Sequence, residues 1–156
     1  MKHLSLRVRA VLLGCSLFSC DVGPFDPEVG APVRERCANS DSDPDTKVSF
    51  KADVLPIFKG QAGPVGCGCH QPTNPRPIGL EQAGLDLSTF DGVMAGGVNS
   101  RGKTVIPGAP CESVLVQKIS AGPPFGAQMP FDGPPFLGDA DRQLISDWIV
   151  EGAKNE

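Results

Sequence analysis

A run of apolar residues at helical spacing predicts a helix just after residue 48. Its members are Phe50, Val54, Ile57 and Phe58. Ser49 is the expected N-cap, because its hydroxyl can accept a hydrogen bond from the first turn. Pro56 lies inside the run and is expected to kink or shorten the helix, since proline has no N–H to donate.

The same spacing predicts a helix over residues 139–150. Its apolar face carries Leu144, Ile145, Trp148 and Ile149. Acidic residues in the first turn suit the positive end of a helix, and Gly152 is expected to end it. Trp148 is expected to lie in the core.

Two shorter helices are expected between these two. One covers residues 89–95, with Ser88 as its N-cap and a pair of glycines at its end. Met94 on this helix is expected to pack in the core. The other covers residues 110–119 and opens with a proline, which suits a first helical position.

The segments over residues 60–79 and 120–138 are rich in glycine and proline and are expected to be loops. No segment alternates apolar and polar residues over a useful length, so no strand is expected. The chain has 156 residues with 19 glycines, 16 prolines and no tyrosine, which favours short helices and long loops. The sequence therefore predicts one all-α domain over residues 49–156, with a small apolar interior that something else must help to fill.

The first 20 residues are typical of an export signal. Basic residues precede an apolar stretch, residues 10–19, that is too short to span a membrane. The stretch ends in the sequence LFSC, which resembles the lipobox of bacterial lipoproteins. Cleavage would remove residues 1–19 as a signal peptide, and lipidation of Cys20 would anchor the chain. A second candidate box ends at Cys15, and an ordinary signal that leaves Cys20 unmodified is the other alternative.

Residues 20–48 are rich in proline, aspartate and serine and are expected to be a flexible tether between the lipid and the domain. The net charge of −4 argues against a nucleic-acid partner. No apolar stretch reaches 18 residues, so attachment to a membrane is expected through the lipid only. Loss of the signal removes His3 and leaves His70 as the one histidine.

The residues that carry chemistry are Cys67-Gly68-Cys69-His70. In a c-type haem site two thiols bind the haem and the adjacent histidine binds the iron, with the usual spacing Cys-x-x-Cys-His. Here the two cysteines are one residue closer, and on a helix they would diverge by about 200°. Both thiols reach one haem edge only on a non-helical backbone, for which Gly66 and Gly68 leave room. The alternative is that Cys69 is the only covalent attachment.

Met129 is the candidate for the opposite face of the iron. Haem iron held by histidine often takes a methionine thioether as its other ligand. Met129 lies in a loop directly before Pro130, where a side chain can point inward without following a helical stripe. A core methionine that fills a gap is the alternative.

Seven segments, in this order, resemble the small c-type cytochrome domains of secreted proteins from myxobacteria and planctomycetes. They are Val54-Leu-Pro-Ile-Phe58, Cys69-His70, Gly84-Leu-Asp-Leu-Ser88, Gly96-Gly97, Val105-Ile-Pro-Gly-Ala-Pro-Cys-Glu-Ser-Val-Leu115, Met129-Pro130 and Trp148-Ile-Val-Glu-Gly-Ala153. The resemblance implies a cytochrome c-like fold around one covalent haem c, with His70 as proximal ligand and Met129 as distal ligand. It also implies a thioether at Cys69, while Cys67 stands at a spacing that departs from the family's.

The remaining thiols allow several arrangements. If haem takes Cys67 and Cys69, then Cys37 and Cys111 are left to form a disulfide. Without haem, a zinc or copper site from Cys67, Cys69, His70 and Cys111, or a redox disulfide between Cys67 and Cys69, is an alternative. Another is a haem-free lipoprotein of the same fold, held by a Cys67–Cys111 or a Cys37–Cys111 disulfide.

The resemblance implies a monohaem c-type cytochrome that transfers single electrons at the cell envelope and is not an enzyme. Its expected location is the periplasmic face or the outer membrane, by way of the lipid anchor. Redox proteins with basic docking patches are the expected partners, because the chain is acidic.

Overall fold

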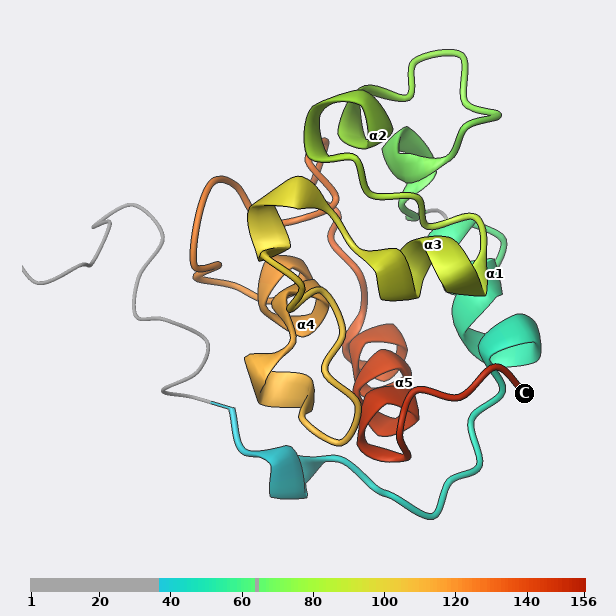
Figure 1. The fold of residues 1–156 in the computed structure, drawn as a ribbon, viewed down its shortest axis with the longest axis vertical. Coiled ribbons are helices and arrows are strands. Elements are labelled where there is room, and N and C mark those ends of the chain that lie inside the picture. Colours follow the sequence, from blue (N-terminus) through green and yellow to red (C-terminus); the bar gives the residue numbers. More distant parts are fainter. Residues whose placement is uncertain (1–36, 64) are drawn as a thin grey trace, which may run out of the picture.

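The computed structural model describes residues 37–63 and 65–156, and every regular element within them is a helix or a helical turn (Figure 1). The elements are η2 (Asn39–Asp41), η3 (Phe50–Val54), α1 (Leu55–Phe58), η4 (Gly68–His70), α2 (Ile78–Ala83), α3 (Phe90–Ala95), η5 (Val98–Ser100), η6 (Pro110–Glu112), α4 (Val114–Ile119) and α5 (Asp139–Val150). The prediction of an all-α fold is confirmed for this part of the chain. None of these helices is long and apolar enough to cross a membrane. The expected signal peptide and Cys20 lie outside the described residues.

The predicted first helix is present, and its pitch changes along its length. The Ser49 side chain accepts a hydrogen bond from the N–H of Ala52 at 3.1 Å, which confirms the expected N-cap. The chain then winds as the π-helical turn η3 before it continues as α1. Pro56, the second residue of α1, needs room for its ring beside the carbonyl of Ala52, and a wider turn supplies that room. The expected kink therefore takes the form of a π turn.

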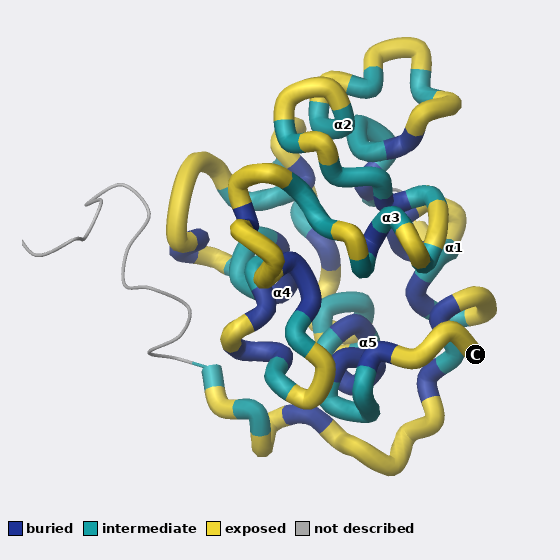
Figure 2. Tube along the Cα trace, viewed as in Figure 1, coloured by how far each residue is buried: buried dark blue, intermediate teal, exposed yellow. Residues whose placement is uncertain are grey.

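The helix α5 has the bounds that the sequence predicted, and it ends before Gly152, whose φ is 103°. Trp148 on this helix is fully buried, as expected. Its ring lies 5.3 Å from that of Phe50 and 6.4 Å from that of Phe90, centroid to centroid. Figure 2 shows this buried centre where α5 meets the start of the domain.

The helix α3 begins one residue later than predicted. Its N-cap is Thr89, whose hydroxyl accepts a hydrogen bond from the N–H of Gly92 at 3.1 Å. Ser88 is not the cap, because its hydroxyl donates to the Asp86 carboxylate at 2.6 Å instead. Met94 packs against the core, as expected.

The prediction of one helix over residues 110–119 is wrong, because the chain is extended at Ser113, between η6 and α4. The buried Ser113 hydroxyl accepts a hydrogen bond from the N–H of Ile106 at 2.8 Å and donates to the carbonyl of Ala109 at 2.9 Å. These bonds hold Ser113 out of the helix. The sequence also missed α2, a short helix that ends at Gly84 with a φ of 61°.

Residues 37–48, which we call the strap, lie along the domain (Figure 1) although the sequence analysis placed them in the tether. Cys37 forms a disulfide with Cys111. At the other end of the strap, Val48 is buried and its N–H donates to the Glu151 carboxylate at 2.9 Å. The packed region therefore extends back to Cys37.

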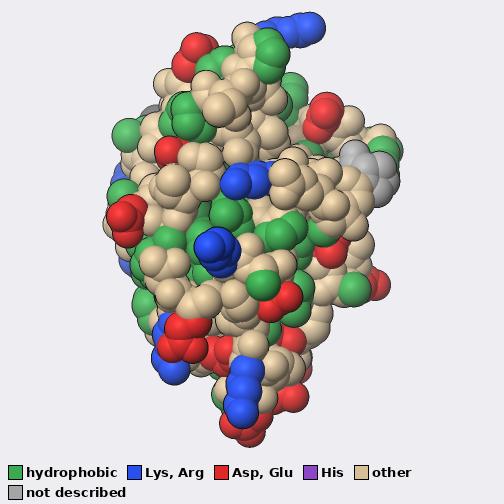
Figure 3. All heavy atoms as spheres, turned by 90° about the vertical axis from the view of Figure 1, so that its right-hand side faces the viewer, with side chains coloured by type: hydrophobic (Ala, Val, Ile, Leu, Met, Phe, Trp, Pro, Cys, Tyr) green, Lys and Arg blue, Asp and Glu red, His purple; other side chains and the backbone are tan. Residues whose placement is uncertain are grey.

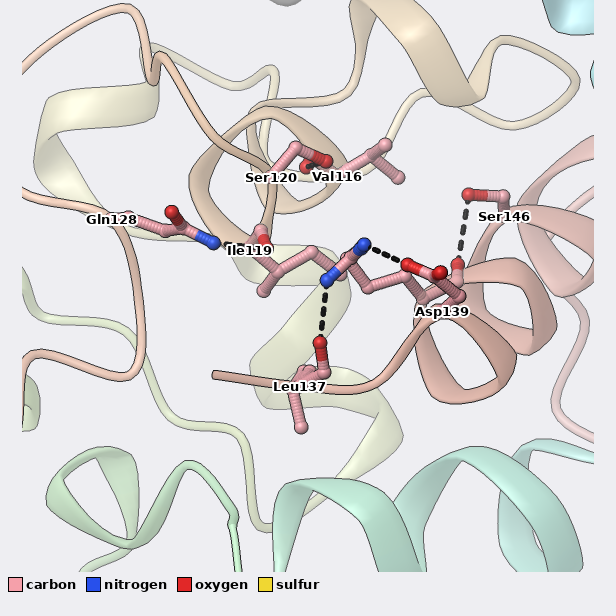
Figure 4. A network of polar contacts seen from close by, with 8 residues as sticks. Val116, Ile119, Ser120, Gln128, Leu137, Asp139 and Ser146 are labelled. Atoms are coloured by element: carbon pink, nitrogen blue, oxygen red, sulfur yellow. Dashed lines mark hydrogen bonds and ion pairs between the residues drawn. The ribbon is translucent and has the colours of Figure 1, made fainter. Parts of the chain in front are cut away.

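The loop over residues 120–138 contains no helix, as predicted, and hydrogen bonds tie it to the helices on both sides (Figure 4). The Gln128 amide donates to the carbonyl of Ile119 at 3.2 Å. The Arg142 guanidinium donates to the carbonyl of Leu137 at 2.5 Å. These contacts fix both ends of the segment that carries Met129.

Candidate functional site

A cavity of about 300 Å³ lies among η4, α2, α4 and the loop over residues 125–131. Figure 1 draws these elements in green to orange. Leu85, Leu87, Leu115 and Ile119 contribute to a wall that is mainly apolar. The volume lies at the lower end of the range typical of small-molecule sites, about 300–1,000 Å³.

His70 reaches the cavity wall with its ring orientation fixed by the backbone. Its Nδ1 lies 3.1 Å from the carbonyl oxygen of Leu85, and because a carbonyl only accepts, Nδ1 carries the hydrogen. In the neutral ring, Nε2 then keeps its lone pair, which is the arrangement of a metal-binding histidine. A second bond, from the N–H of Leu87 to the His70 carbonyl at 3.0 Å, joins the same two segments.

The charge state of His70 suits this role. Burial lowers the pKa of His70 below its usual value of 6.5. The hydrogen bond to Leu85 opposes this shift, and the nearby charge of Lys118 adds to it. The ring is therefore neutral at pH 7, so Nε2 is available to a metal.

Gly79 of α2 lies directly against the His70 ring. A Cβ at this position would lie 2.7 Å from Nε2, 2.8 Å from Cδ2 and 2.9 Å from Cε1. Distances so nearly equal place that carbon over the ring face and not along the Nε2 lone pair. Only glycine permits this close approach.

The two cysteines of the motif have different surroundings. Cys67 is buried, with 7% of its surface exposed, and it lines the cavity together with His70. Cys69 is half-buried and is not part of the cavity wall, and both thiols are free. Burial, with a smaller contribution from Cys69, raises the pKa of Cys67 to about 12, so that Cys67 is a neutral thiol at pH 7.

Met129 is half-buried on the cavity wall, in a loop that Lys118 of α4 holds in place. The N–H of Met129 donates to the carbonyl of Lys118 at 2.8 Å. The Lys118 ammonium donates to the carbonyls of Phe125 at 2.6 Å and Ala127 at 2.5 Å. It also lies 4.8 Å from the centre of the Phe125 ring, close enough for a cation–π contact. One residue thus fixes the loop segment 125–129 through both its side chain and its backbone.

Two of these groups could not be recognised from the sequence. The Leu85 carbonyl belongs to the backbone, so no residue type could reveal it. Lys118 is the one charged residue of α4, and that pattern indicates a solvent-exposed face as readily as a cavity. In the structure Cys67, His70 and Met129 line the same cavity, whereas Cys69 is not among the residues that line it.

The metal-site alternative is not supported. Cys111 is bonded to Cys37 and is unavailable as a ligand, and the same bond excludes a Cys67–Cys111 disulfide. Within residues 37–63 and 65–156, no group of three or more His, Cys, Asp or Glu side chains is placed to hold a metal ion. Cys67 and Cys69 are free thiols and form no redox disulfide.

Comparison with known families supports a cytochrome c-like domain in this region. The family model described as Planctomycete cytochrome C matches residues 67–131. Every residue that lines the cavity falls within this match, including His70 and Met129. No curated protein and no solved structure matches the chain.

The residues of the cavity fit a haem. The apolar wall suits the faces of a porphyrin, and an imidazole with a free Nε2 is the usual proximal donor. A methionine thioether on the same cavity wall is a soft donor of the kind found in cytochromes c. A buried thiol beside the imidazole is available for covalent attachment.

Replacement of Gly79 by alanine is expected to displace the His70 ring and break its hydrogen bond to Leu85. Alanine in a helix is favoured over glycine by up to about 1 kcal/mol, so without a clash the substitution would raise the free energy of unfolding. An unchanged or lower free energy of unfolding would therefore indicate the clash with the His70 ring. The measurement is the NMR signal of the His70 ring N–H, together with chemical denaturation. Gly63→Ala is the matched control, because a Cβ there meets nothing within 4 Å. An unchanged His70 signal in Gly79→Ala would contradict the described packing.

Replacement of Lys118 by methionine is expected to loosen the loop segment 125–129. The variant keeps an apolar side chain of similar length but loses two charge-assisted hydrogen bonds. A loss of about 1–2 kcal/mol in local stability corresponds to roughly 5- to 30-fold faster amide hydrogen exchange. Hydrogen–deuterium exchange with mass spectrometry measures this, and Lys103→Met, at an exposed site, is the control. Equal exchange in wild type and Lys118→Met would rule out the role given to Lys118.

Proposed function

We propose that the protein is a monohaem c-type cytochrome that transfers single electrons. His70 is the proximal ligand through Nε2, Met129 is the distal ligand, and the segment Cys67-Gly68-Cys69 provides the covalent attachment. The observation that carries the proposal is that His70 and Met129, 59 positions apart by their numbers, line the same mainly apolar cavity. The match of this region to a cytochrome family supports the same conclusion.

A bound haem would supply the one-electron chemistry, because its iron is stable in two oxidation states. The chain supplies the surroundings that tune this chemistry. The Leu85 carbonyl keeps the His70 tautomer fixed and raises the basicity of Nε2. A methionine thioether at the other position favours a higher reduction potential. The cavity wall is mainly apolar, and with both positions filled the proposal assigns no enzymatic reaction to the site.

The partners we propose are redox proteins with basic docking patches. The full chain has a net charge of −4. Acidic side chains gather toward the lower end of the face drawn in Figure 3, with some basic ones among them. Complementary charge would raise the rate of encounter, and this rate would fall as salt is added.

We further propose that the protein is exported and anchored to the cell envelope by a lipid on Cys20. The support is the resemblance of residues 17–20 to a lipobox after a basic and apolar leader. Acyl chains on one cysteine anchor a protein through about 0.8 kcal/mol for each buried methylene. Cys20→Ala is expected to move the protein from the membrane fraction to the soluble fraction. An unchanged distribution in cell fractionation would refute the anchor.

The test of the main proposal is the visible spectrum of protein produced together with haem-attachment machinery. One covalent haem per chain is expected, seen in the pyridine haemochrome spectrum and as an increment in intact mass. Met129→Ala is expected to keep the haem, lose the methionine-to-iron absorption band of the oxidised form and lower the reduction potential. The matched control is Met94→Ala, since Met94 packs against the core and should leave that band in place.

Two outcomes would contradict the proposal at different points. Wild-type protein without colour would remove the haem assignment and leave a haem-free lipoprotein of cytochrome-like fold. An unchanged methionine band in Met129→Ala would remove the distal ligand alone.

A further inference from the structure

The turn η4 and its N-cap residue, Cys67, orient the two cysteines and the histidine of the motif. The N–H of His70 donates to the carbonyl of Cys67 at 2.9 Å, three residues earlier, which closes a 3-10 turn. Successive residues of such a turn are about 120° apart, so Cys69 is rotated about 120° away from His70. Cys67 is the N-cap, just before the turn, with φ −103° and ψ 37°.

The cavity wall agrees with this geometry. Cys67 and His70 both line the cavity, while Cys69 does not. Cys67 is also the more buried of the two thiols. Burial and contact with the cavity thus separate the two cysteines in the same way.

Hydrogen bonds to the neighbouring chain hold the turn in this orientation. The N–H of Cys67 donates to the carbonyl of Phe58 at 2.9 Å, and the side-chain amide of Gln71 donates to the same carbonyl at 3.2 Å. On the other side, the N–H of Leu87 donates to the carbonyl of His70. Presenting Cys69 to the cavity would require rotation of the turn and the loss of these bonds.

From this arrangement we infer that haem is attached through Cys67 alone and that the Cys69 thiol stays free. The inference rests on the proposed function, and it assigns the thioether to Cys67 where the family resemblance implies Cys69. In the usual motif, an α-helical backbone brings both thiols and the imidazole to one face, at positions i, i+3 and i+4. Here the motif is one residue shorter, and only its first thiol lines the same cavity as the imidazole.

The attachment is a balanced addition. The Cys67 sulfur forms a bond to one carbon of a haem vinyl group, the S–H bond breaks, and the hydrogen goes to the other vinyl carbon. No electrons are gained or lost overall, so no oxidant or reductant is consumed. The second vinyl group stays unmodified, and Cys69 keeps its hydrogen.

The experiment compares Cys67→Ala with Cys69→Ala in the full chain, each produced with haem-attachment machinery. Two alanine substitutions two residues apart in one turn form a matched pair, and circular dichroism with the presence of the Cys37–Cys111 disulfide checks that both variants fold. Haem that resists acidic organic extraction is the measure of covalent attachment. Peptide mapping by mass spectrometry locates the haem in the wild type, and a thiol-specific maleimide identifies the free cysteine.

We expect Cys69→Ala to keep the wild-type amount of covalent haem and Cys67→Ala to lose it. In the wild type the haem adduct is expected on Cys67 and the maleimide on Cys69. An adduct on Cys69, adducts on both cysteines, or loss of covalent haem in Cys69→Ala would overturn the inference while the proposed function stands. Absence of haem from the wild type would overturn the proposed function, and this inference with it.

Discussion

A histidine binds a metal only through a ring nitrogen that keeps a free lone pair, and in this protein one backbone carbonyl decides which nitrogen that is. The Leu85 oxygen accepts the Nδ1 hydrogen of His70 and so leaves Nε2 as the donor. The same short segment is bonded back to the His70 carbonyl through Leu87. The ring face then lies against Gly79, which fixes the ring from the side of α2. Ring orientation, tautomer and charge state of His70 therefore depend on the packing of residues 85–87 beside η4.

The second half of the site depends on a different element. Met129 lies in a glycine- and proline-rich loop that has no helix of its own, so its position must come from outside. Lys118 fixes that position. Its ammonium group donates to two carbonyls of the loop, and its own carbonyl accepts a hydrogen bond from the N–H of Met129. Because Lys118 belongs to α4, the position of the loop that carries Met129 depends on α4 and on the core beneath it.

The rest of the molecule stabilises this arrangement from a small core. The aromatic contacts of Trp148 join α5 to the start of the domain. The Cys37–Cys111 disulfide fastens the strap beside η6, just before α4. With the proposed haem in place, its apolar faces would add contact area to the apolar wall of the cavity.

The sequence by itself determined the helical class, the bounds of α5, the N-cap at Ser49 and the residues around which a site could form. These follow from local rules: the spacing of apolar residues and the hydrogen bonds of a capping hydroxyl act within one or two turns. The sequence was wrong where a distant or competing partner decided the outcome, as at Ser113, which bonds to Ile106 and Ala109, and at Ser88, which bonds to Asp86. Only the tertiary structure brought Met129 to the cavity of His70, placed Lys118 behind it and set Cys67 and Cys69 apart. Those relations depend on backbone carbonyls and on the pitch of one turn, which the order of residue types does not reveal.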